Sequence, residues 1–247
     1  MKSSFIFALL LFISAAGICS TRAQTNGAAT PATAGATDQE QRTIDKHAKP
    51  ILKALALNNA AKEARVRAII GEYIKALDAW HPQHDAEIKE LWQQFNQAHG
   101  KQDQAATDAA LAKIDAVYAS FKPQHEKFLD DLSSVLTPPQ VETVEDVLTI
   151  NKVKITFNAY GEIFHGLTDA QKAFILKNLQ AAREEAIDAG SMTEKSAFFK
   201  KYKTKIEAYL TAQGYDVKQS YRDFVAKQKA ESTAKKAAAQ KTTGEKP

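Results

Sequence analysis

Apolar residues recur at intervals of three and four along most of the chain, which is the spacing of one face of an α-helix. The stripes comprise Val66, Ile69, Ile70, Tyr73, Ile74, Leu77 and Trp80; Leu111, Ile114, Val117, Tyr118 and Phe121; Ile175, Leu179, Ala182 and Ala186; and Phe198, Tyr202, Ile206, Tyr209 and Leu210. A shorter helix over 44–55 is expected before the first stripe. The pattern predicts an all-α fold: a helical bundle with a long, kinked helical hairpin on its N-terminal side.

One stretch departs from this pattern. In KVKITFNAY, residues 152–160, Val153, Ile155 and Phe157 alternate at the spacing of a β-strand. No second strand is predicted to pair with it, and an isolated strand is not stable. We therefore expect an extended connector here.

Two similar phrases mark helix starts. LTPPQ at 136–140 and LTDAQ at 167–171 each place a threonine three residues before a glutamine. Thr137 and Thr168 suit the N-cap, and Gln140 and Gln171 can complete a capping box. Gly190 and Gly214 are expected to follow helix ends, with new helices capped near Ser191 and Asp216.

The phrase PQH occurs at 82–84 and again at 123–125, on both arms of a hairpin that turns around HGKQD, residues 99–103. Antiparallel pairing about that turn places the two phrases side by side. Each proline must break or kink its helix and free backbone carbonyls.

Three histidines, His81, His84 and His125, would gather at these prolines, with Asp85 and Glu126 nearby. Imidazole and carboxylate groups suit zinc or copper, so a metal site is one interpretation. The favoured interpretation is that the histidines cap the kinked helices or face water, and no cofactor is expected.

The ends of the chain differ in composition from its centre. Lys2 and the apolar run from Phe5 to Ile18 predict a signal peptide over 1–23, cleaved after Ala23. Lipidation at Cys19 is disfavoured because Ile18 precedes it. Residues 24–38 and the Lys/Ala-rich segment 231–247 are expected to be disordered, which leaves one helical domain over 39–230.

Charge and motifs exclude several functions. Removing Lys2 and Arg22 with the signal leaves 31 basic against 29 acidic residues, so no nucleic-acid footprint is expected. Cleavage also removes the one cysteine, and with it disulfide and thiolate chemistry. The sequence has no phosphate loop, HExxH motif, nucleophile elbow or transmembrane span.

The chain resembles an uncharacterised family of secreted bacterial proteins, the domain-of-unknown-function family numbered 3826. The resemblance rests on AAKEARVRAIIGEYIKALDAWH, LTPPQVETVEDVLT and LTDAQKAFILKNLQAAREEAIDAGSMTEKSAFFKKYKTKIEAYLTAQGYD. Ser196 and Phe199 stand where the family pattern leads us to expect a histidine and a glycine. Members tend to occur among polysaccharide-utilisation genes, which implies a supporting role in glycan capture or breakdown. The paired LTxxQ phrases are also similar to those of the periplasmic Spy and CpxP chaperones.

Cationic and aromatic residues of the C-terminal half could form a sugar-binding surface. They are Arg183, Lys201, Tyr202, Lys205, Tyr209 and Tyr215. Aromatic rings stack on sugar faces and basic groups pair with uronate carboxylates. The competing interpretation makes the tyrosines core anchors and the lysines a solvated face.

Three functions follow, in order of preference. The first is an exported accessory protein that binds an acidic oligosaccharide. The second is a chaperone-like protein that holds an unfolded protein client, and the third is a glycan-active hydrolase or lyase. Glu184, Glu185 and Asp188 are available to an enzyme, but no feature of the sequence distinguishes an acid from a nucleophile among them.

Overall fold

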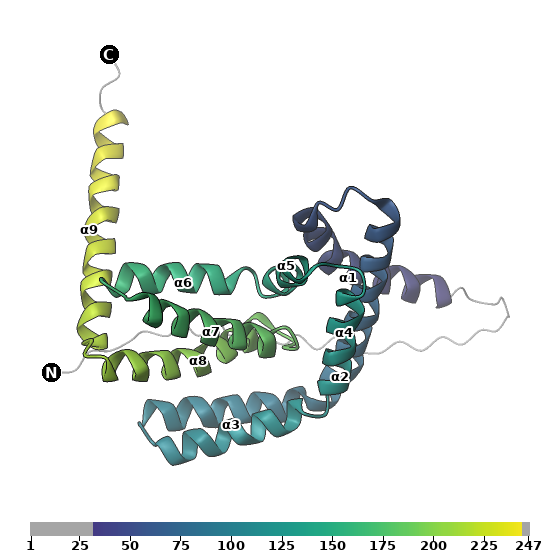
Figure 1. Cartoon of the computed structure of the whole chain (residues 1–247), viewed down its shortest axis with the longest axis horizontal. Helices are drawn as coiled ribbons and strands as arrows, with labels where there is room; N and C mark the ends of the chain where they lie inside the picture. Colours follow the sequence, from purple (N-terminus) through teal and green to yellow (C-terminus); the bar gives the residue numbers. More distant parts are fainter. Residues whose placement is uncertain (1–31, 244–247) are drawn as a thin grey trace, which may run out of the picture.

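The chain folds into helices throughout the part that the structure, a computed structural model, describes: residues 32–243. Nine helices and no strand occur in this range (Figure 1). They are α1 (Ala32–Leu55), α2 (Ala60–Gly100), α3 (Gln104–Tyr118), α4 (Lys122–Ser133), α5 (Pro138–Leu148), α6 (Lys152–Ile163), α7 (Asp169–Ala186), α8 (Met192–Ala212) and α9 (Val217–Thr243). The predicted all-α class is confirmed. The predicted signal peptide 1–23, with Cys19 and the cleavage position, lies outside the described residues.

The long hairpin is formed by α2 and α3, joined by a short turn after Gly100. Asp103 caps α3 by accepting a hydrogen bond from the Ala106 amide at 3.0 Å. Figure 1 shows α2 changing direction along its length, and Pro82 lies inside this helix. A proline removes one backbone hydrogen bond and crowds the preceding turn, which accounts for the bend.

The bend at Pro82 lets α2 serve two hydrophobic clusters. Its first half packs with α1, α4 and α5 through residues such as Ile70 and Tyr73. Its second half packs with α3, α6, α7 and α8 through residues such as Ile88 and Phe95. Trp80, immediately before the bend, packs against both clusters. The region around Pro82 is therefore where the two halves of the fold join.

The predicted helix caps are present. Thr137 with Gln140 and Thr168 with Gln171 both form capping boxes, at the starts of α5 and α7. Ser191 caps α8 through the Glu194 amide at 3.1 Å, and Asp216 caps α9 through the Gln219 amide at 2.9 Å. Gly214 has φ +94°, as a residue that ends a helix in the left-handed region requires.

The expected extended connector at 152–160 is wrong, because this stretch lies within α6. Val153, Tyr160 and Ile163 are buried at helical spacing, whereas Ile155 exposes 61% of its surface. Alternating apolar residues over only five positions, 153–157, fit the period of a helix as well as that of a strand. Packing against α7 and α9 decides in favour of the helix.

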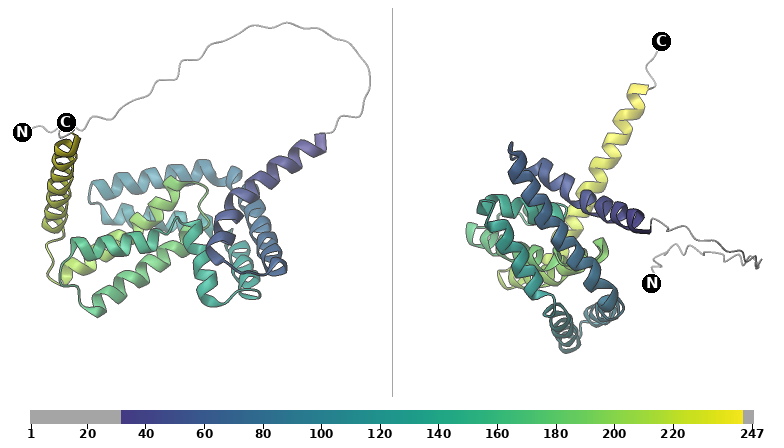
Figure 2. Two further views of the ribbon diagram at one scale, coloured as in Figure 1. Left: turned by 90° about the horizontal axis from the view of Figure 1, so that it is seen from above. Right: turned by 90° about the vertical axis from the view of Figure 1, so that its right-hand side faces the viewer.

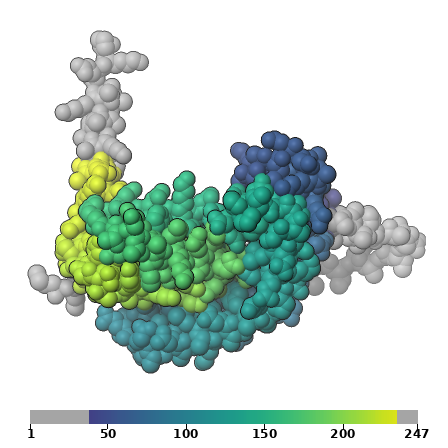
Figure 3. All heavy atoms as spheres, in the orientation of Figure 1, coloured from purple at the N-terminus to yellow at the C-terminus, as the bar shows by residue number. Residues whose placement is uncertain are grey.

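The first and last helices, α1 and α9, extend into the segments whose composition predicts disorder. α1 begins at Ala32, within the segment 24–38, and α9 continues to Thr243, past residue 230. Alanine and lysine are strong helix formers, so a polar, small-residue segment is compatible with a helix as well as with disorder. Figure 2 shows the ribbons of α1 and α9 extending away from the rest of the molecule, and Figure 3 shows the base of α9, in yellow, packed beside α6 and α8. Among the described helices, none has the length and apolar character needed to cross a membrane.

Candidate functional site

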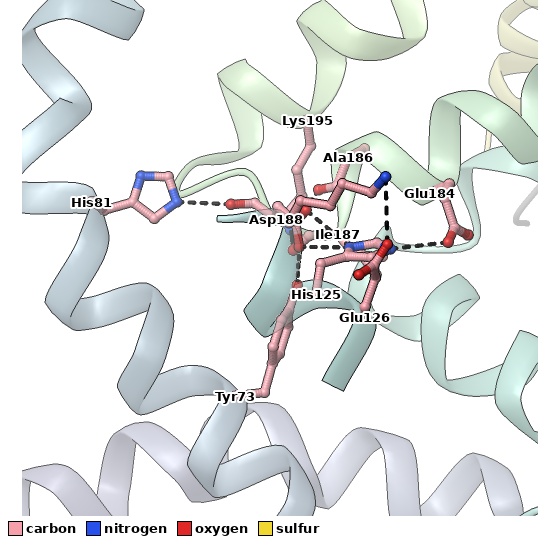
Figure 4. A network of polar contacts seen from close by, with 10 residues as sticks. Tyr73, His81, His125, Glu126, Glu184, Ala186, Ile187, Asp188 and Lys195 are labelled. Atoms are coloured by element: carbon pink, nitrogen blue, oxygen red, sulfur yellow. Dashed lines mark hydrogen bonds and ion pairs between the residues drawn. The ribbon is translucent and has the colours of Figure 1, made fainter. Parts of the chain in front are cut away.

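The turn between α7 and α8, residues 187–191, lies where the two halves of the fold meet, and side chains of α2 and α4 converge on it (Figure 4). The Asp188 carboxylate accepts a hydrogen bond from the Tyr73 hydroxyl at 2.5 Å and lies 3.0 Å from His125 Nδ1. The backbone carbonyl of Asp188 accepts a hydrogen bond from His81 Nε2 at 2.8 Å. One residue of the turn thus connects α2 and α4 to the end of α7.

The two prolines place the two histidines. His81 immediately precedes Pro82 at the bend of α2, and His125 follows Pro123 in the first turn of α4. The predicted proximity of the PQH phrases is therefore realised through Asp188, which both His81 and His125 contact. His84 does not join them, because its ring stacks near Trp80 with centroids 4.4 Å apart.

His125 is held as an imidazolium between two carboxylates. Its Nδ1 faces Asp188, and its Nε2 lies 3.0 Å from Glu184 Oε1. Burial lowers the pKa of His125, but the hydrogen bonds and charges of Asp188 and Glu184 outweigh burial and raise it to about 10. Burial, followed by the charge of Asp188, also raises the pKa of Tyr73 well above its ordinary value. Near neutral pH, His125 therefore stays charged and Tyr73 stays neutral. With Asp188 and Glu184 they form a buried polar clamp that holds the turn in place.

His81 is held against the turn by contacts at both ring nitrogens. Its Nδ1 lies 2.7 Å from Asp85 Oδ1, and the ring is 6% exposed. Gly190 packs so closely that a Cβ atom there would lie 2.7 Å from His81 Nδ1. The glycine is needed here for close approach.

A cleft of about 790 Å³ opens on the other side of this turn. α1, α2, the α5–α6 turn, the α7–α8 turn and the start of α8 line it, and its volume falls within the range of small-molecule sites. Ile74, Leu77 and Ile187 give it an apolar floor. Its charged and titratable lining residues are Lys46, His47, Asp78, His81, Asp85 and Lys195.

The cleft contains basic groups without carboxylate partners. Neither Lys46 nor Lys195 makes an ion pair with any residue that the structure describes. Burial lowers the pKa of Lys195 to about 8, although the charges of Asp188 and Glu194 act in the opposite direction. Burial, then the charges of Lys195 and Lys46, lower the pKa of His47. Lys46 is the exposed cation of this lining that has no ion-pair partner among the described residues, so it is the group with which an anionic ligand could pair.

The rim of the cleft holds a strained turn. Ile150 and Asn151, between α5 and α6, have φ of +53° and +56°. The left-handed region costs an L-residue about 1–2 kcal/mol, and a β-branched side chain such as that of Ile150 is rare there. Ile150 nevertheless exposes 51% of its surface at the cleft. Strain of this kind concentrates at binding sites.

The basic residues of the predicted sugar-binding surface are mostly engaged in ion pairs. Arg183 is 6% exposed and pairs with Glu145 at 2.7 Å and Asp146 at 2.8 Å. Lys201 pairs with Asp115 at 2.8 Å and Glu185 at 2.9 Å. Lys205 is exposed and makes no ion pair with a described residue.

The tyrosines of that surface are likewise used within the fold. The Tyr202 hydroxyl donates to Glu185 at 2.7 Å, and Tyr209 stacks on Phe174 with centroids 3.9 Å apart. The Tyr215 hydroxyl lies 3.3 Å from Gln171 Oε1. Sugar binding by the six residues stays a prediction, but a ligand there would have to compete with these internal partners.

No set of three or more histidine, cysteine, aspartate and glutamate side chains within the described range is arranged to hold a metal ion. The metal site considered for His81, His84 and His125 stays a prediction, and the described structure gives each of the three histidines another contact. His81 and His125 bind the turn, and His84 packs on an aromatic ring.

Sequence reasoning missed the cleft and the central role of Asp188. Asp188 follows the end of α7 rather than lying on its flank beside Glu184, so its carboxylate can point across to α2 and α4. The lysines of the cleft come from α1 and α8, which no local motif connects. The repeated PQH phrase was the one signal that indicated this part of the fold.

The fold and the site define an all-α protein in which a buried polar clamp supports one wall of a ligand-sized cleft. A family model described as a protein of unknown function, DUF3826, matches residues 41–230. The chain belongs to this family. No curated protein matches the chain, and the comparisons do not show the LTxxQ similarity to the Spy and CpxP chaperones.

Proposed function

We propose that this protein is exported and binds an acidic oligosaccharide through the cleft between α1, α2 and the α7–α8 turn. The observation that carries the proposal is the placement of Lys46 on that cleft, exposed and without an ion-pair partner among the described residues. A uronate carboxylate supplies the missing partner, since a charge-assisted hydrogen bond is about twice as strong as a neutral one.

The rest of the lining suits a sugar. Ile74, Leu77 and Pro50 offer apolar surface for the C–H face of a ring, and Asp78 and Ser191 offer acceptors for hydroxyl groups. The exposed apolar side chains of Ile150 and Met192 extend the surface along the rim. The cleft volume of about 790 Å³ suits one or two sugar rings rather than a folded partner.

The cleft is a better site than the surface around Arg183 and Lys201. Both of those cations already satisfy two carboxylates each, so a glycan would gain little by displacing them. The genomic context that the family resemblance implies supports a glycan as the ligand. The predicted signal peptide supports export.

Calorimetric titration of the purified protein with an oligogalacturonate and with a neutral oligosaccharide of equal length tests the proposal. We expect heat from the acidic sugar alone, and weaker binding at higher salt because ions screen the carboxylate contacts. Lys46→Gln should weaken binding on the order of tenfold, the loss of one charged hydrogen bond. Lys154→Gln, on the exposed face of α6 and away from the cleft, is the matched control and should bind as the parent does.

Equal heats from acidic and neutral sugars, or unchanged binding by Lys46→Gln, would contradict the proposal. Absence of heat together with protection of an unfolded client from aggregation would favour the chaperone function. Shortened sugars in the titration cell would favour a hydrolase or lyase.

A further inference from the structure

The side chain of Lys195 bends back from the first turn of α8 to the end of α7. Its Nζ donates hydrogen bonds to the Ala186 carbonyl at 3.1 Å and to the Ile187 carbonyl at 3.3 Å. The same residue lines the cleft. The amine is therefore held in one place on a wall that a ligand would touch.

The hydrogen-bond partners of Lys195 are compatible with a neutral amine, because both are uncharged backbone carbonyls. A neutral amine has two N–H donors and one lone pair, whereas an ammonium has three donors. The two carbonyls accept both N–H donors of a neutral amine. In the neutral form the remaining tetrahedral position is a lone pair.

The surroundings of Lys195 bring the neutral form within reach at mildly alkaline pH. Burial disfavours its charge and lowers its pKa to about 8. The two nearest carboxylates, Asp188 and Glu194, are occupied by other donors: His125 and Tyr73 for the first, Tyr118 and the Gly190 amide for the second. Neither makes an ion pair with Lys195.

We propose that Lys195 is a nucleophilic amine that forms an imine with an aldehyde or keto group of a compound bound in the cleft. The inference rests on the proposed function insofar as the cleft is the ligand site, and it names the group that reacts there. The reducing-end sugar of a uronate oligosaccharide carries a carboxylate, which Lys46 would bind, and an aldehyde in hemiacetal form, with which Lys195 would react.

The reaction needs no reagent beyond the ligand and water. The Nζ lone pair attacks the carbonyl carbon, and the C=O π pair moves to oxygen, which takes up a proton as nitrogen releases one. The carbinolamine hydroxyl then leaves as water after protonation, the nitrogen lone pair forms the C=N bond, and the resulting iminium nitrogen returns the proton. Amine plus carbonyl give imine plus water, with no change of oxidation state.

The charged and titratable groups around this position come from four elements. They are Lys46 and His47 on α1, Asp78, His81 and Asp85 on α2, Asp188 in the α7–α8 turn, and Glu194 on α8. Protonation of His47 adds positive charge near Lys195 and further favours the neutral amine. Binding of a ligand carboxylate adds negative charge near Lys195 and favours the ammonium form.

Reductive trapping tests the proposal on the whole purified protein. The protein is incubated with propionaldehyde, or separately with glyoxylate, in the presence of cyanoborohydride, and each labelled lysine is located by peptide mass spectrometry. The reference is Lys154, which is exposed and makes no ion pair with a described residue. At slightly alkaline pH we expect propionaldehyde to label Lys195 on the order of tenfold faster than Lys154, because a larger fraction of a low-pKa amine is neutral.

A pH series separates reactivity from access. The labelling rate of Lys195 should level off just above pH 8, while that of Lys154 should keep rising with pH. Lys195→Arg, which keeps donors for both carbonyls, should abolish the fast labelling and leave Lys154 unchanged. Labelling of Lys195 no faster than that of Lys154, or a rate that keeps rising in parallel with it, would show an ordinary capping ammonium and overturn the proposal.

Glyoxylate distinguishes this inference from the proposed function. Its carboxylate should increase labelling at Lys195 over propionaldehyde, and Lys46→Gln should remove that preference. Fast labelling by both aldehydes without any preference would support the nucleophilic amine and contradict acid recognition by Lys46. Slow labelling by both would overturn the nucleophile and leave the calorimetric test of acid binding as it stands.

Discussion

Replacing His125 with glutamine tests whether its imidazolium stabilises the folded chain. In the structure the ring lies between Asp188 and Glu184 and connects α4 to α7 and the α7–α8 turn. Glutamine keeps a hydrogen-bond donor of similar size but carries no charge. The substitution should therefore remove the pH-dependent part of the contribution while preserving most of the packing.

The magnitude follows from the pKa. A pKa of about 10 in the folded chain against 6.5 in the unfolded chain corresponds to about 5 kcal/mol at most. The side chain is 13% exposed, and solvent screens part of the interaction, so we expect about 2–3 kcal/mol. Because the folded-state pKa is raised, this contribution is fully present below pH 6.5 and is lost as the pH rises toward 10.

Urea unfolding followed by circular dichroism, between about pH 6 and pH 10, measures this contribution as the difference between parent and variant. Lys195, with its pKa lowered to about 8 from 10.5, acts oppositely and adds stability as the pH rises between those values. Its effect is common to both proteins and cancels in the difference. His165→Gln, at an exposed histidine, is the control and should show no such difference.

The expected result is a difference in unfolding free energy that shrinks by about 2–3 kcal/mol across this pH range. A difference that stays constant with pH would refute the reasoning, because it would mean that His125 contributes packing alone. A variant as stable as the parent at low pH would refute it as well.

Two further substitutions test neighbouring features. Gly190→Ala places a Cβ against the His81 ring and should destabilise the protein by about 1–3 kcal/mol. Gly161→Ala, where no atom lies near the added Cβ on α6, is the control and should be neutral or stabilising. Equal thermal stabilities of the Gly190→Ala variant and the parent would contradict the close contact. Thr168→Ala removes the N-cap of α7 and should lower the free energy of unfolding by about 0.5–2 kcal/mol without changing ligand binding. Unchanged stability together with lost ligand binding would instead make the LTxxQ phrase a recognition element.

Helix starts could be predicted from the sequence because their chemistry is local. Thr137 and Thr168 cap their helices through residues three positions away, so the five-residue phrases contain nearly all the relevant interactions. The proximity of the PQH phrases could be predicted for a related reason: a hairpin with a recognisable turn fixes the register of its two arms. His81 and His125 accordingly meet at one residue.

The parts that escaped prediction depend on tertiary packing. The stretch 152–160 has apolar residues that fit a strand or a helix, and burial of Val153 and Tyr160 decides between them. The cleft joins Lys46 to Lys195 across 149 positions of sequence, from 46 to 195, with no motif at either end. Arg183 and Lys201 looked available because the sequence does not reveal that Glu145 and Asp115 lie opposite them.

Hydrogen–deuterium exchange with and without an oligogalacturonate tests the central claim, that the cleft binds an acidic ligand. If the cleft binds this ligand, exchange should slow on binding in 44–50, 147–151 and 189–195, segments that line the cleft, and 201–215, which holds most of the alternative surface, should not change. Protection confined to 201–215, with none in the cleft segments, would show that the ligand binds outside the cleft.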